Sequence, residues 1–307
     1  MVIAGPTASG KTALSLELAE RLDAEVISAD SRQVYRGMDI GTAKVGAAER
    51  ARVPHHGLDL VDPDQPFTVA DFRRHALDAL ASIAARGRIA ILAGGTGLYL
   101  RALARGIPVD AAGHDPVIRA ALEARLAADG LHPLVEELRV RAPTMAAGTD
   151  LANPRRVVRA LERTRLVGDQ PPPAPQGYPA PVTWLGTAPH PAAHAVDIET
   201  RAREQFAHGL LDEAASLRDR YPEDLRAFGA MGYREAFEVL AGRLAPEEAI
   251  AVDAQRTRAY ARRQRTWFRS EPDITWLPPG PQRAAAALRH IEAALAHGIV
   301  PLTGGDT

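Results

Sequence analysis

The sequence predicts an α/β fold: a P-loop parallel sheet core with helices on both faces and an inserted all-helical domain. Three observations favour this fold. A glycine-rich loop lies between a short apolar run and a helical pattern at the amino terminus, apolar runs and helical patterns then alternate to about residue 110, and helical patterns alone follow before a proline-rich stretch. Alternating strands and helices are typical of parallel sheets, whose ligands bind at the carboxyl ends of the strands.

Short apolar runs predict four strands in the first 110 residues: Val2–Ala4, Glu25–Ser28, Gly57–Val61 and Ile89–Ala93. Helical periodicity extends from Lys11 to Leu22, between the first two of these runs. Thr68, followed three residues later by Asp71, predicts the capped start of a helix that ends at Gly87. Residues 1–110 are therefore expected to form the first part of the core.

Residues 111–181 are expected to form the inserted domain. Helical patterns cover the segments Pro116–Ala128, Pro133–Arg141 and Pro154–Val167. Asn153 is the expected N-cap of the last helix, Pro154 suits its first turn, and Gly168 follows its end. Six prolines between residues 171 and 181 indicate a stiff connector.

After this connector the sequence returns to the pattern of the core. Strand character reappears at Val182–Leu185 and again at Ile274–Leu277, and amphipathic helices fill most of the remainder. Residues 182–307 are therefore expected to complete the core and to be mostly helical.

The amino-terminal loop matches the pattern G-x-x-x-x-G-K-[ST] of phosphate-binding loops. Its glycines let backbone N–H groups converge on phosphate oxygens, and the helix that follows adds a partial positive charge. Lys11 supplies a compact charge, and Thr12 is expected to bind Mg²⁺. Only Lys11 and Lys44 are lysines among 37 basic residues, which indicates that both stand where arginine would not serve. The residues expected to bind a diphosphate or triphosphate are Gly5, Thr7, Ala8, Ser9, Gly10, Lys11 and Thr12.

Composition excludes several classes of protein. The 307 residues are 46% hydrophobic, yet no stretch approaches the roughly 20 apolar residues that would span a bilayer. A net charge of −1 gives no overall attraction to nucleic acid or membrane, so such a partner must bind a local patch. The absence of cysteine excludes disulfides and fits the cytoplasm, which is the expected location. His55, His56, His190 and His194 lack a carboxylate that would complete a zinc site, so none is expected.

The chemistry of the loop depends on the acids near it. A P-loop enzyme that splits ATP needs an acid at the end of a neighbouring strand to hold Mg²⁺, but Ile89–Ala93 leads into Gly94, Gly95 and Thr96. Asp30, after Glu25–Ser28, is the only acid in a comparable position. We expect it to cap a turn, to bind Mg²⁺, or to act as a general base beside the phosphates.

Two clusters of arginine indicate a nucleic-acid partner. The first, on the last helix of the insertion, contains Arg155, Arg156, Arg159, Arg163 and Arg165. The second contains Arg256, Arg258, Arg262, Arg263, Arg265 and Arg269 and no acid. Spacings of four, three and four place Arg258, Arg262, Arg265 and Arg269 in one stripe on a helix, with Tyr260, Trp267 and Phe268 interleaved. Either cluster alone is also compatible with a solvated face, but arginines among aromatic side chains suit RNA phosphates and unstacked bases.

Several motifs together resemble the tRNA dimethylallyltransferases. They are Gly5–Thr12, Ser28–Tyr35, Gly37–Lys44, Gly94–Tyr99, Gly232–Glu235 and Tyr260–Arg269, and they extend over almost the full length. The resemblance implies transfer of a dimethylallyl group from dimethylallyl diphosphate to the exocyclic amine of the adenosine just 3′ of a tRNA anticodon, giving N6-dimethylallyladenosine. The loop would then hold a leaving group, with Mg²⁺ as the implied cofactor.

The resemblance also implies roles for single residues. Asp30 matches the general base, Thr96 a residue that contacts the target nucleotide, and Arg201 an arginine near the diphosphate, so these three are the expected catalytic residues. Asp197 stands where the family often has a further arginine. The insertion resembles the family's clamp on the anticodon stem-loop, and a monomer is expected. The residues expected to contact tRNA are Asp30, Ser31, Arg32, Gln33, Thr96, Arg119, Arg155, Arg156, Val157, Val158, Arg159, Arg262, Arg263, Gln264, Arg265, Thr266, Trp267 and Arg269.

Three other functions stay open on the sequence. An adenylate isopentenyltransferase would transfer the same group to free AMP, ADP or ATP and would not need the insertion or the arginine stripe. A small-molecule kinase would keep the loop, but it would bind and turn over ATP. A non-catalytic RNA-binding module would leave the loop and Asp30 without a use.

Overall fold

The computed structural model describes residues 1–109 and 113–296, and the chain divides into two compact units. The larger unit combines Met1–Arg105 with Gly177–Thr307, and the smaller one is Gly106–Gln176. The smaller unit starts and ends slightly before the insertion expected at residues 111–181. The expected boundary between residues 110 and 111, and residues 297–307 at the end of the last segment, lie outside the described residues.

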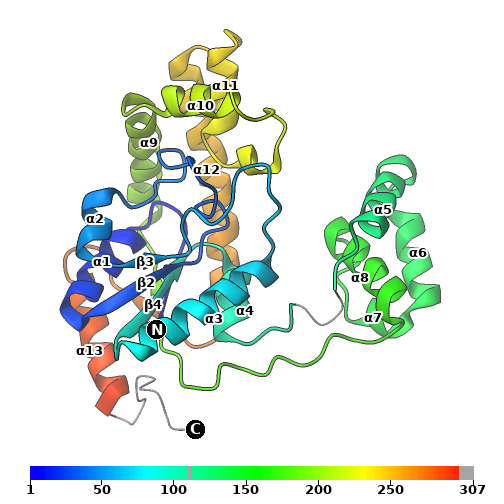
Figure 1. The fold of residues 1–307 in the computed structure, drawn as a ribbon, viewed down its shortest axis with the longest axis horizontal. Helices are drawn as coiled ribbons and strands as arrows, with labels where there is room; N and C mark the ends of the chain where they lie inside the picture. Colours follow the sequence, from blue (N-terminus) through cyan, green and yellow to red (C-terminus); the bar gives the residue numbers. More distant parts are fainter. Residues whose placement is uncertain (110–112, 297–307) are drawn as a thin grey trace. The chain divides into compact units, whose positions relative to one another are not determined.

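The larger unit contains a six-stranded parallel sheet in the order β3-β2-β4-β1-β5-β6. Strands β2, β3 and β4 are labelled in Figure 1. Its strands are β1 (Val2–Ala4), β2 (Ala24–Ser28), β3 (His55–His56), β4 (Ile89–Gly94), β5 (Trp184–Thr187) and β6 (Ile274–Leu277). The α/β fold with a parallel sheet is thus confirmed. The strand expected at Gly57–Val61 is wrong, because the chain pairs two residues earlier, at β3. Positive φ angles of 83° at Gly57 and 56° at Asp59 break the extended conformation of a strand.

Successive residues of each strand point to opposite faces of the sheet, so both faces carry apolar side chains. Helices cover both of these faces. The helices of the larger unit are α1 (Lys11–Leu22), α2 (Ala47–Arg52), α3 (Val69–Ala85), α4 (Gly97–Ala104), α9 (Pro191–Ala207), α10 (Leu210–Arg218), α11 (Tyr233–Leu240), α12 (Pro246–Arg269) and α13 (Arg283–Ala296), with a short 3-10 helix at Arg226–Gly229. Val2 and Ala4 lie in one core with side chains of α3 and α4. Ile3 lies in the opposite core with side chains of α1 and α13.

Helix α12 connects the sheet to a group of helices beyond its carboxyl edge (Figure 1). Ile250, near its start, packs with side chains of α9, and Phe268, near its end, is buried in the core of the sheet. Helices α10 and α11 pack on the segment after β2 through a core that includes Val34, Met38 and Tyr233. The last turns of α12 therefore lie close to the loops that follow β1 and β4.

The smaller unit is all-helical within its described residues, 106–109 and 113–176. Its helices are α5 (Pro116–Asp129), α6 (Leu131–Arg141), α7 (Pro143–Ala147) and α8 (Pro154–Val167). Asn153 caps α8 by accepting hydrogen bonds from the N–H groups of Arg155 and Arg156, as the sequence predicts. Leu122, Leu138 and Leu161 are among the residues of its separate core.

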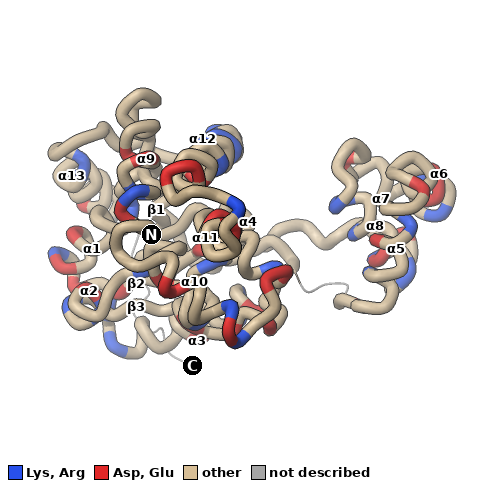
Figure 2. The backbone as a smooth tube through the Cα atoms, turned by 90° about the horizontal axis from the view of Figure 1, so that it is seen from above, with Lys and Arg blue, Asp and Glu red and all other residues tan. Residues whose placement is uncertain are grey.

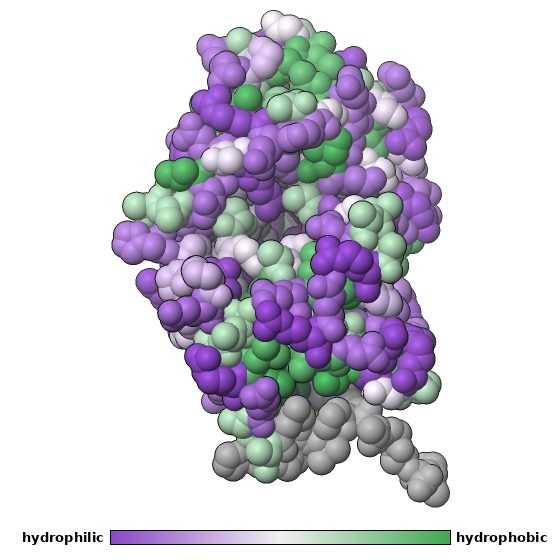
Figure 3. All heavy atoms as spheres, turned by 90° about the vertical axis from the view of Figure 1, so that its left-hand side faces the viewer, coloured by the Kyte–Doolittle hydropathy of each residue, from purple (hydrophilic) through white to green (hydrophobic). Residues whose placement is uncertain are grey.

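The surface of the larger unit is mixed in character. Hydrophobic residues are scattered among hydrophilic ones on the face in Figure 3, which gives no extended apolar patch there. No helix within residues 1–109 and 113–296 is both long and apolar enough to cross a membrane.

Candidate active site

Strand order brings the loops with candidate functional residues to one edge of the sheet. The order β2-β4-β1-β5 lines up the loops that follow these four strands. They carry, in the same order, Asp30, Thr96, the phosphate-binding loop and, at the last residue of β5, Thr187. Because the strands are parallel, these groups share the carboxyl edge.

The phosphate-binding loop has the backbone conformation that its glycines permit. Gly10 is the N-cap of α1 with a φ of 80°, and it has no side chain to accept hydrogen bonds from the first turn. Those N–H groups are therefore available to an anion. At Gly5 any side chain is excluded, since a Cβ there would lie 2.1 Å from the hydroxyl oxygen of Thr187.

Lys11 lies within the loop and is close to Asp30. Its ammonium group donates a hydrogen bond to the carbonyl oxygen of Pro6 at 2.6 Å. Burial lowers the pKa of Lys11 to about 8, and the nearby Asp30 carboxylate partly offsets this effect. A cation in the phosphate-binding loop and a carboxylate on the loop after β2 thus interact electrostatically.

Thr7 is held at each of its polar atoms. Its N–H donates to the side-chain oxygen of Gln264 at 2.8 Å, its carbonyl oxygen accepts from His194 at 2.8 Å, and its hydroxyl accepts from Arg201 at 3.1 Å. Gln264 was expected to contact tRNA; instead its buried amide also donates to the carbonyl oxygen of Gly95 at 2.9 Å. It joins the loops after β1 and β4.

Asp30 and Thr96 lie on neighbouring loops that are hydrogen-bonded to each other. The carboxylate of Asp30 accepts from the N–H of Arg32 at 2.8 Å, which fixes the turn at residues 30–32. Thr96 accepts from the N–H of Ser31 at 3.1 Å, and its own N–H donates to the carbonyl oxygen of Ala29 at 3.2 Å. Within residues 1–109 and 113–296, one oxygen of the half-buried Asp30 carboxylate accepts this hydrogen bond, and the second oxygen is open to another proton donor.

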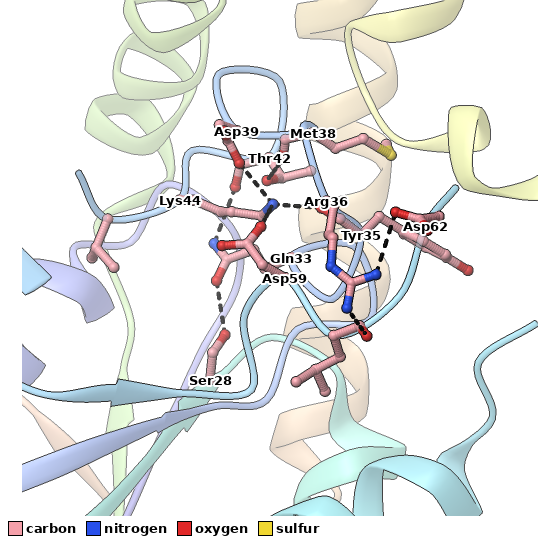
Figure 4. Close-up of polar contacts among 12 residues, drawn as sticks. Ser28, Gln33, Tyr35, Arg36, Met38, Asp39, Thr42, Lys44, Asp59 and Asp62 are labelled. Atoms are coloured by element: carbon pink, nitrogen blue, oxygen red, sulfur yellow. Dashed lines mark hydrogen bonds and ion pairs between the residues drawn. The ribbon is translucent and has the colours of Figure 1, made fainter. Parts of the chain in front are cut away.

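The segment after Asp30 is held by a polar network around Lys44 (Figure 4). Lys44 has a fully buried side chain that donates to Asp39 at 2.7 Å, to Asp59 at 2.6 Å and to the carbonyl oxygen of Tyr35. The amide of Gln33 accepts from Ser28 at 2.7 Å and donates to the carbonyl oxygens of Thr42 and Ala43 at 3.1 and 3.3 Å. Gln33, expected to contact tRNA, therefore uses its amide group inside the protein.

Replacing Lys44 with methionine is expected to lower the free energy of unfolding by about 2 kcal/mol, because the hydrogen bonds of its buried ammonium group to Asp39, Asp59 and the carbonyl oxygen of Tyr35 are lost. Thermal or urea unfolding measures this loss. Arg50→Met is the matched control, since Arg50 pairs with the same Asp59 at 2.8 Å from a half-buried position and should cost about 1 kcal/mol or less. Equal losses for the two variants would contradict a special role of Lys44.

The arginines near the end of α12 remain largely open to solvent. Figure 2 shows basic residues along this helix, and the exposed side chains among those expected to contact tRNA are Arg262, Arg263, Thr266 and Arg269. Arg265 is half-buried and contacts His194 at 3.1 Å. Trp267 is half-buried beneath the guanidinium of Arg101, 4.2 Å from its ring centre. The stripe therefore divides into solvent-facing and inward-facing members.

In the smaller unit, the residues expected to contact tRNA divide in the same way. Val157 and Val158 are buried in its core, so a tRNA contact through their side chains is excluded, because α8 is amphipathic. Arg155 and Arg156 are exposed. Arg119 and Arg159 bind the buried Glu162, the latter at 2.7 Å.

Glu162 organises one side of this unit. Burial alone would raise the pKa of Glu162, but hydrogen bonds from Arg159, Arg119 and His114 hold it at about 2. The carboxylate is therefore charged at neutral pH and fixes two arginines that the sequence assigned to RNA. Both guanidinium groups are half-buried.

Three residues of the site were not expected from the sequence. His194 holds Thr7, Thr187 lies 2.6 Å from the hydroxyl of Ser9, and Arg283 donates to the carbonyl oxygen of Ser9 at 2.9 Å. For His194 a signal existed, since it shares the buried face of α9 with Ile198 and Ala202 at spacings of four. The contacts of Thr187 and Arg283 with Ser9 join segments more than 170 residues apart, and no local sequence pattern predicts them.

Comparisons with known proteins agree over most of the chain. A family model described as IPP transferase matches residues 33–271, and one described as isopentenyl transferase matches residues 1–55. A tRNA dimethylallyltransferase of Roseiflexus sp. is 46% identical, over 91% of this chain and 92% of that protein. One of Thermus thermophilus is 44% identical, over 94% and 95%. The crystal structure of the full-length tRNA isopentenylpyrophosphate transferase from Bacillus halodurans is similar with a TM-score of 0.72 and 38% identity, covering 96% of both chains.

Proposed function

Because the chain belongs to the IPP transferase family, we propose that it transfers a dimethylallyl group from dimethylallyl diphosphate to the N6 amine of the adenosine just 3′ of a tRNA anticodon. Relatives 46% and 44% identical over most of its length carry the name tRNA dimethylallyltransferase, so the protein is a prenyl transferase that acts on tRNA. The observation that carries the finer assignment is that Asp30 lies at the same edge of the sheet as the diphosphate-binding loop and interacts electrostatically with Lys11 in that loop.

Asp30 is the general base in this reaction. The bond between C1 of the dimethylallyl group and the diphosphate oxygen breaks, a bond between C1 and N6 forms, and N6 loses a proton to Asp30. An adenine amine is a weak nucleophile, and a positioned base accelerates such steps by about 10²- to 10⁴-fold. The target adenine must leave the anticodon stack to reach the Asp30 carboxylate, and this unstacking is easiest in a single-stranded loop.

Lys11, Arg201 and the N–H groups at the start of α1 stabilise the departing diphosphate, which takes the bonding electron pair. Residues 1–109 and 113–296 contain no group of three or more acidic, histidine or cysteine side chains that would hold a metal ion. Mg²⁺ commonly binds one or two protein groups together with phosphate oxygens and water. The exposed hydroxyl of Thr12 fits that pattern, and Mg²⁺ held there would neutralise charge on the leaving group.

The tRNA contacts are proposed for two surfaces, one on each unit. On the larger unit, these contacts are the exposed residues near the end of α12, namely Arg262, Arg263, Thr266 and Arg269, together with Ser31, Arg32 and Thr96. On the smaller unit, they are Arg119, Arg155, Arg156 and Arg159. Each surface presents guanidinium groups, which bind phosphate oxygens in two-point contacts. We further propose that the enzyme works as a cytoplasmic monomer.

Replacing Arg262 and Arg269 together by alanine is expected to weaken tRNA binding and to flatten its salt dependence by about one unit for each phosphate that is no longer neutralised. Binding titrations between low and physiological salt measure both quantities. Arg203→Ala is the control, because Arg203 is an exposed arginine of α9 that pairs with Glu247 at 2.7 Å. An unchanged salt slope in the double variant would assign the stripe to a solvated face instead.

The choice of acceptor distinguishes this function from its alternatives. The purified protein is offered dimethylallyl diphosphate with either an unmodified tRNA or free AMP, ADP and ATP, and the prenylated product is quantified. We expect product with tRNA and far less with the free nucleotides. Preference for free AMP, ADP or ATP would favour an adenylate isopentenyltransferase, and ATP turnover without prenyl transfer would favour a kinase.

A further inference from the structure

The backbone N–H and carbonyl groups of Thr7 link the diphosphate-binding loop to the helix that presents the arginine stripe. Gln264 and Arg265 are consecutive residues of α12. Gln264 binds the N–H of Thr7 directly, and Arg265 reaches the carbonyl oxygen of Thr7 through His194. Two neighbouring residues of one helix thus hold both polar backbone atoms of a loop that lies 257 residues away in sequence.

We propose that His194 and Gln264 are positioning residues for prenyl transfer: they fix the backbone N–H and carbonyl groups of Thr7 in the diphosphate-binding loop, and His194 does so as a neutral imidazole whose Nδ1 accepts a hydrogen bond from Arg265. This role deepens the proposed function and rests on it. Neither residue touches the reacting atoms; both act through the loop.

The hydrogen-bond partners of His194 determine which of its ring nitrogens carries a proton. A carbonyl oxygen only accepts, so Nε2 of His194 carries the proton that is donated to Thr7. A guanidinium only donates, so Nδ1 accepts from Arg265 and bears no proton. His194 is 1% exposed, and burial lowers its pKa, which favours the neutral form.

Two of the three charged groups around His194 also lower its pKa. Arg265 on α12 and Lys11 in the loop disfavour protonation, whereas Asp197 on α9 favours it. Protonation would place a second N–H at Nδ1 opposite the Arg265 guanidinium, and like charges would meet. Since the folded pKa is lowered, the arrangement is intact at neutral pH and is lost as the pH falls through that pKa.

Gln264 also fixes Thr7, by accepting a hydrogen bond from its N–H, whereas His194 binds its carbonyl oxygen. The amide of Gln264 fits between Thr7 and the carbonyl oxygen of Gly95, and a Cβ on Gly95 would lie 2.3 Å from its side-chain nitrogen. The loops after β1 and β4 are thereby held at a fixed spacing. An apolar side chain in this position would leave the N–H of Thr7 and the buried carbonyl oxygen of Gly95 without these partners, which commonly costs about a tenfold change or more in binding.

The test measures binding of inorganic pyrophosphate with Mg²⁺ by calorimetry, without tRNA, for the full chain and four variants. We expect His194→Leu and Gln264→Leu to bind about tenfold more weakly at pH 8. His194→Gln should bind within about threefold of the unsubstituted protein, because its amide replaces the Nε2 donor. His190→Gln, at the exposed N-cap of α9, is the matched control and should bind normally.

The pH profile separates positioning from a merely structural role. As the pH falls from 8 through the lowered pKa of His194, the unsubstituted protein should lose affinity relative to His194→Gln, which does not titrate; titration of pyrophosphate itself is common to both. In prenyl transfer, His194→Leu should raise the KM for dimethylallyl diphosphate and leave the KM for tRNA unchanged.

Thermal unfolding of each variant shows that it is folded before binding is compared. Normal pyrophosphate binding by both leucine variants, or a constant affinity ratio between the unsubstituted protein and His194→Gln across pH, would overturn this positioning role. If the unsubstituted protein bound no pyrophosphate at all, the proposed function would fail, and the positioning role with it. Normal pyrophosphate binding without prenyl transfer to tRNA would overturn the proposed function alone.

Discussion

Replacing Asp30 with asparagine is expected to lower the rate of prenyl transfer by about 10²- to 10⁴-fold, because asparagine cannot take the proton from the adenine amine. The amide oxygen of asparagine still accepts the hydrogen bond that the N–H of Arg32 donates to Asp30 at 2.8 Å, so the turn at residues 30–32 should be retained. Single-turnover kinetics with saturating tRNA and dimethylallyl diphosphate measure the effect on the chemical step.

The binding of tRNA provides the control for this variant. Affinity should remain within a few fold, since the arginines of α12 and of the smaller unit are unaltered. A near-normal rate in Asp30→Asn would remove Asp30 from the mechanism. A loss of tRNA affinity that matched the loss of rate would instead make Asp30 a binding residue.

Replacing Lys11 with methionine is expected to reduce the rate by about 10²- to 10³-fold, since the charge that faces the departing diphosphate is lost. A pH effect accompanies this role. Burial lowers the pKa of Lys11 to about 8, so the ligand-free protein loses the charge as the pH rises through that value. Affinity for pyrophosphate should therefore fall between pH 8 and pH 10.

Lys11→Arg is the matched variant for the pH effect, because a guanidinium stays charged over this range. It should bind pyrophosphate with a flatter pH dependence, although it should transfer the prenyl group less well. Parallel pH profiles for lysine and arginine at this position would assign the fall in affinity to another group.

Local patterns were sufficient to predict most elements of the fold. The helix Lys11–Leu22, the cap formed by Thr68 and Asp71, and the cap at Asn153 all follow from signals within a few residues, and the structure confirms them. Helix α4 was not expected, since its start at Gly97 comes shortly after Gly94 and Gly95, and this glycine pair indicates only the end of a strand.

Errors arose where distant contacts decide the conformation. Gly57–Val61 has an apolar composition, but Asp59 turns to bind Lys44 and Arg50, and a strand cannot form there. In the site, the phosphate-binding loop and Asp30 could be found because the residues themselves carry the chemistry. The contacts of Gln264 and His194 with Thr7 could not, since they depend on how α9 and α12 pack beside the loop that follows β1.

The most direct measurement of the central claim follows the two products of one reaction. The protein is incubated with dimethylallyl diphosphate, Mg²⁺ and unmodified tRNA in the absence of ATP, the tRNA is digested to nucleosides for mass analysis, and released diphosphate is quantified. If the loop at Gly5–Thr12 holds the leaving group while Asp30 receives the proton from the acceptor, N6-dimethylallyladenosine and diphosphate should appear in a one-to-one ratio. Release of diphosphate without prenylated adenosine in the tRNA, or no reaction unless ATP is added, would contradict the proposed prenyl transfer to tRNA.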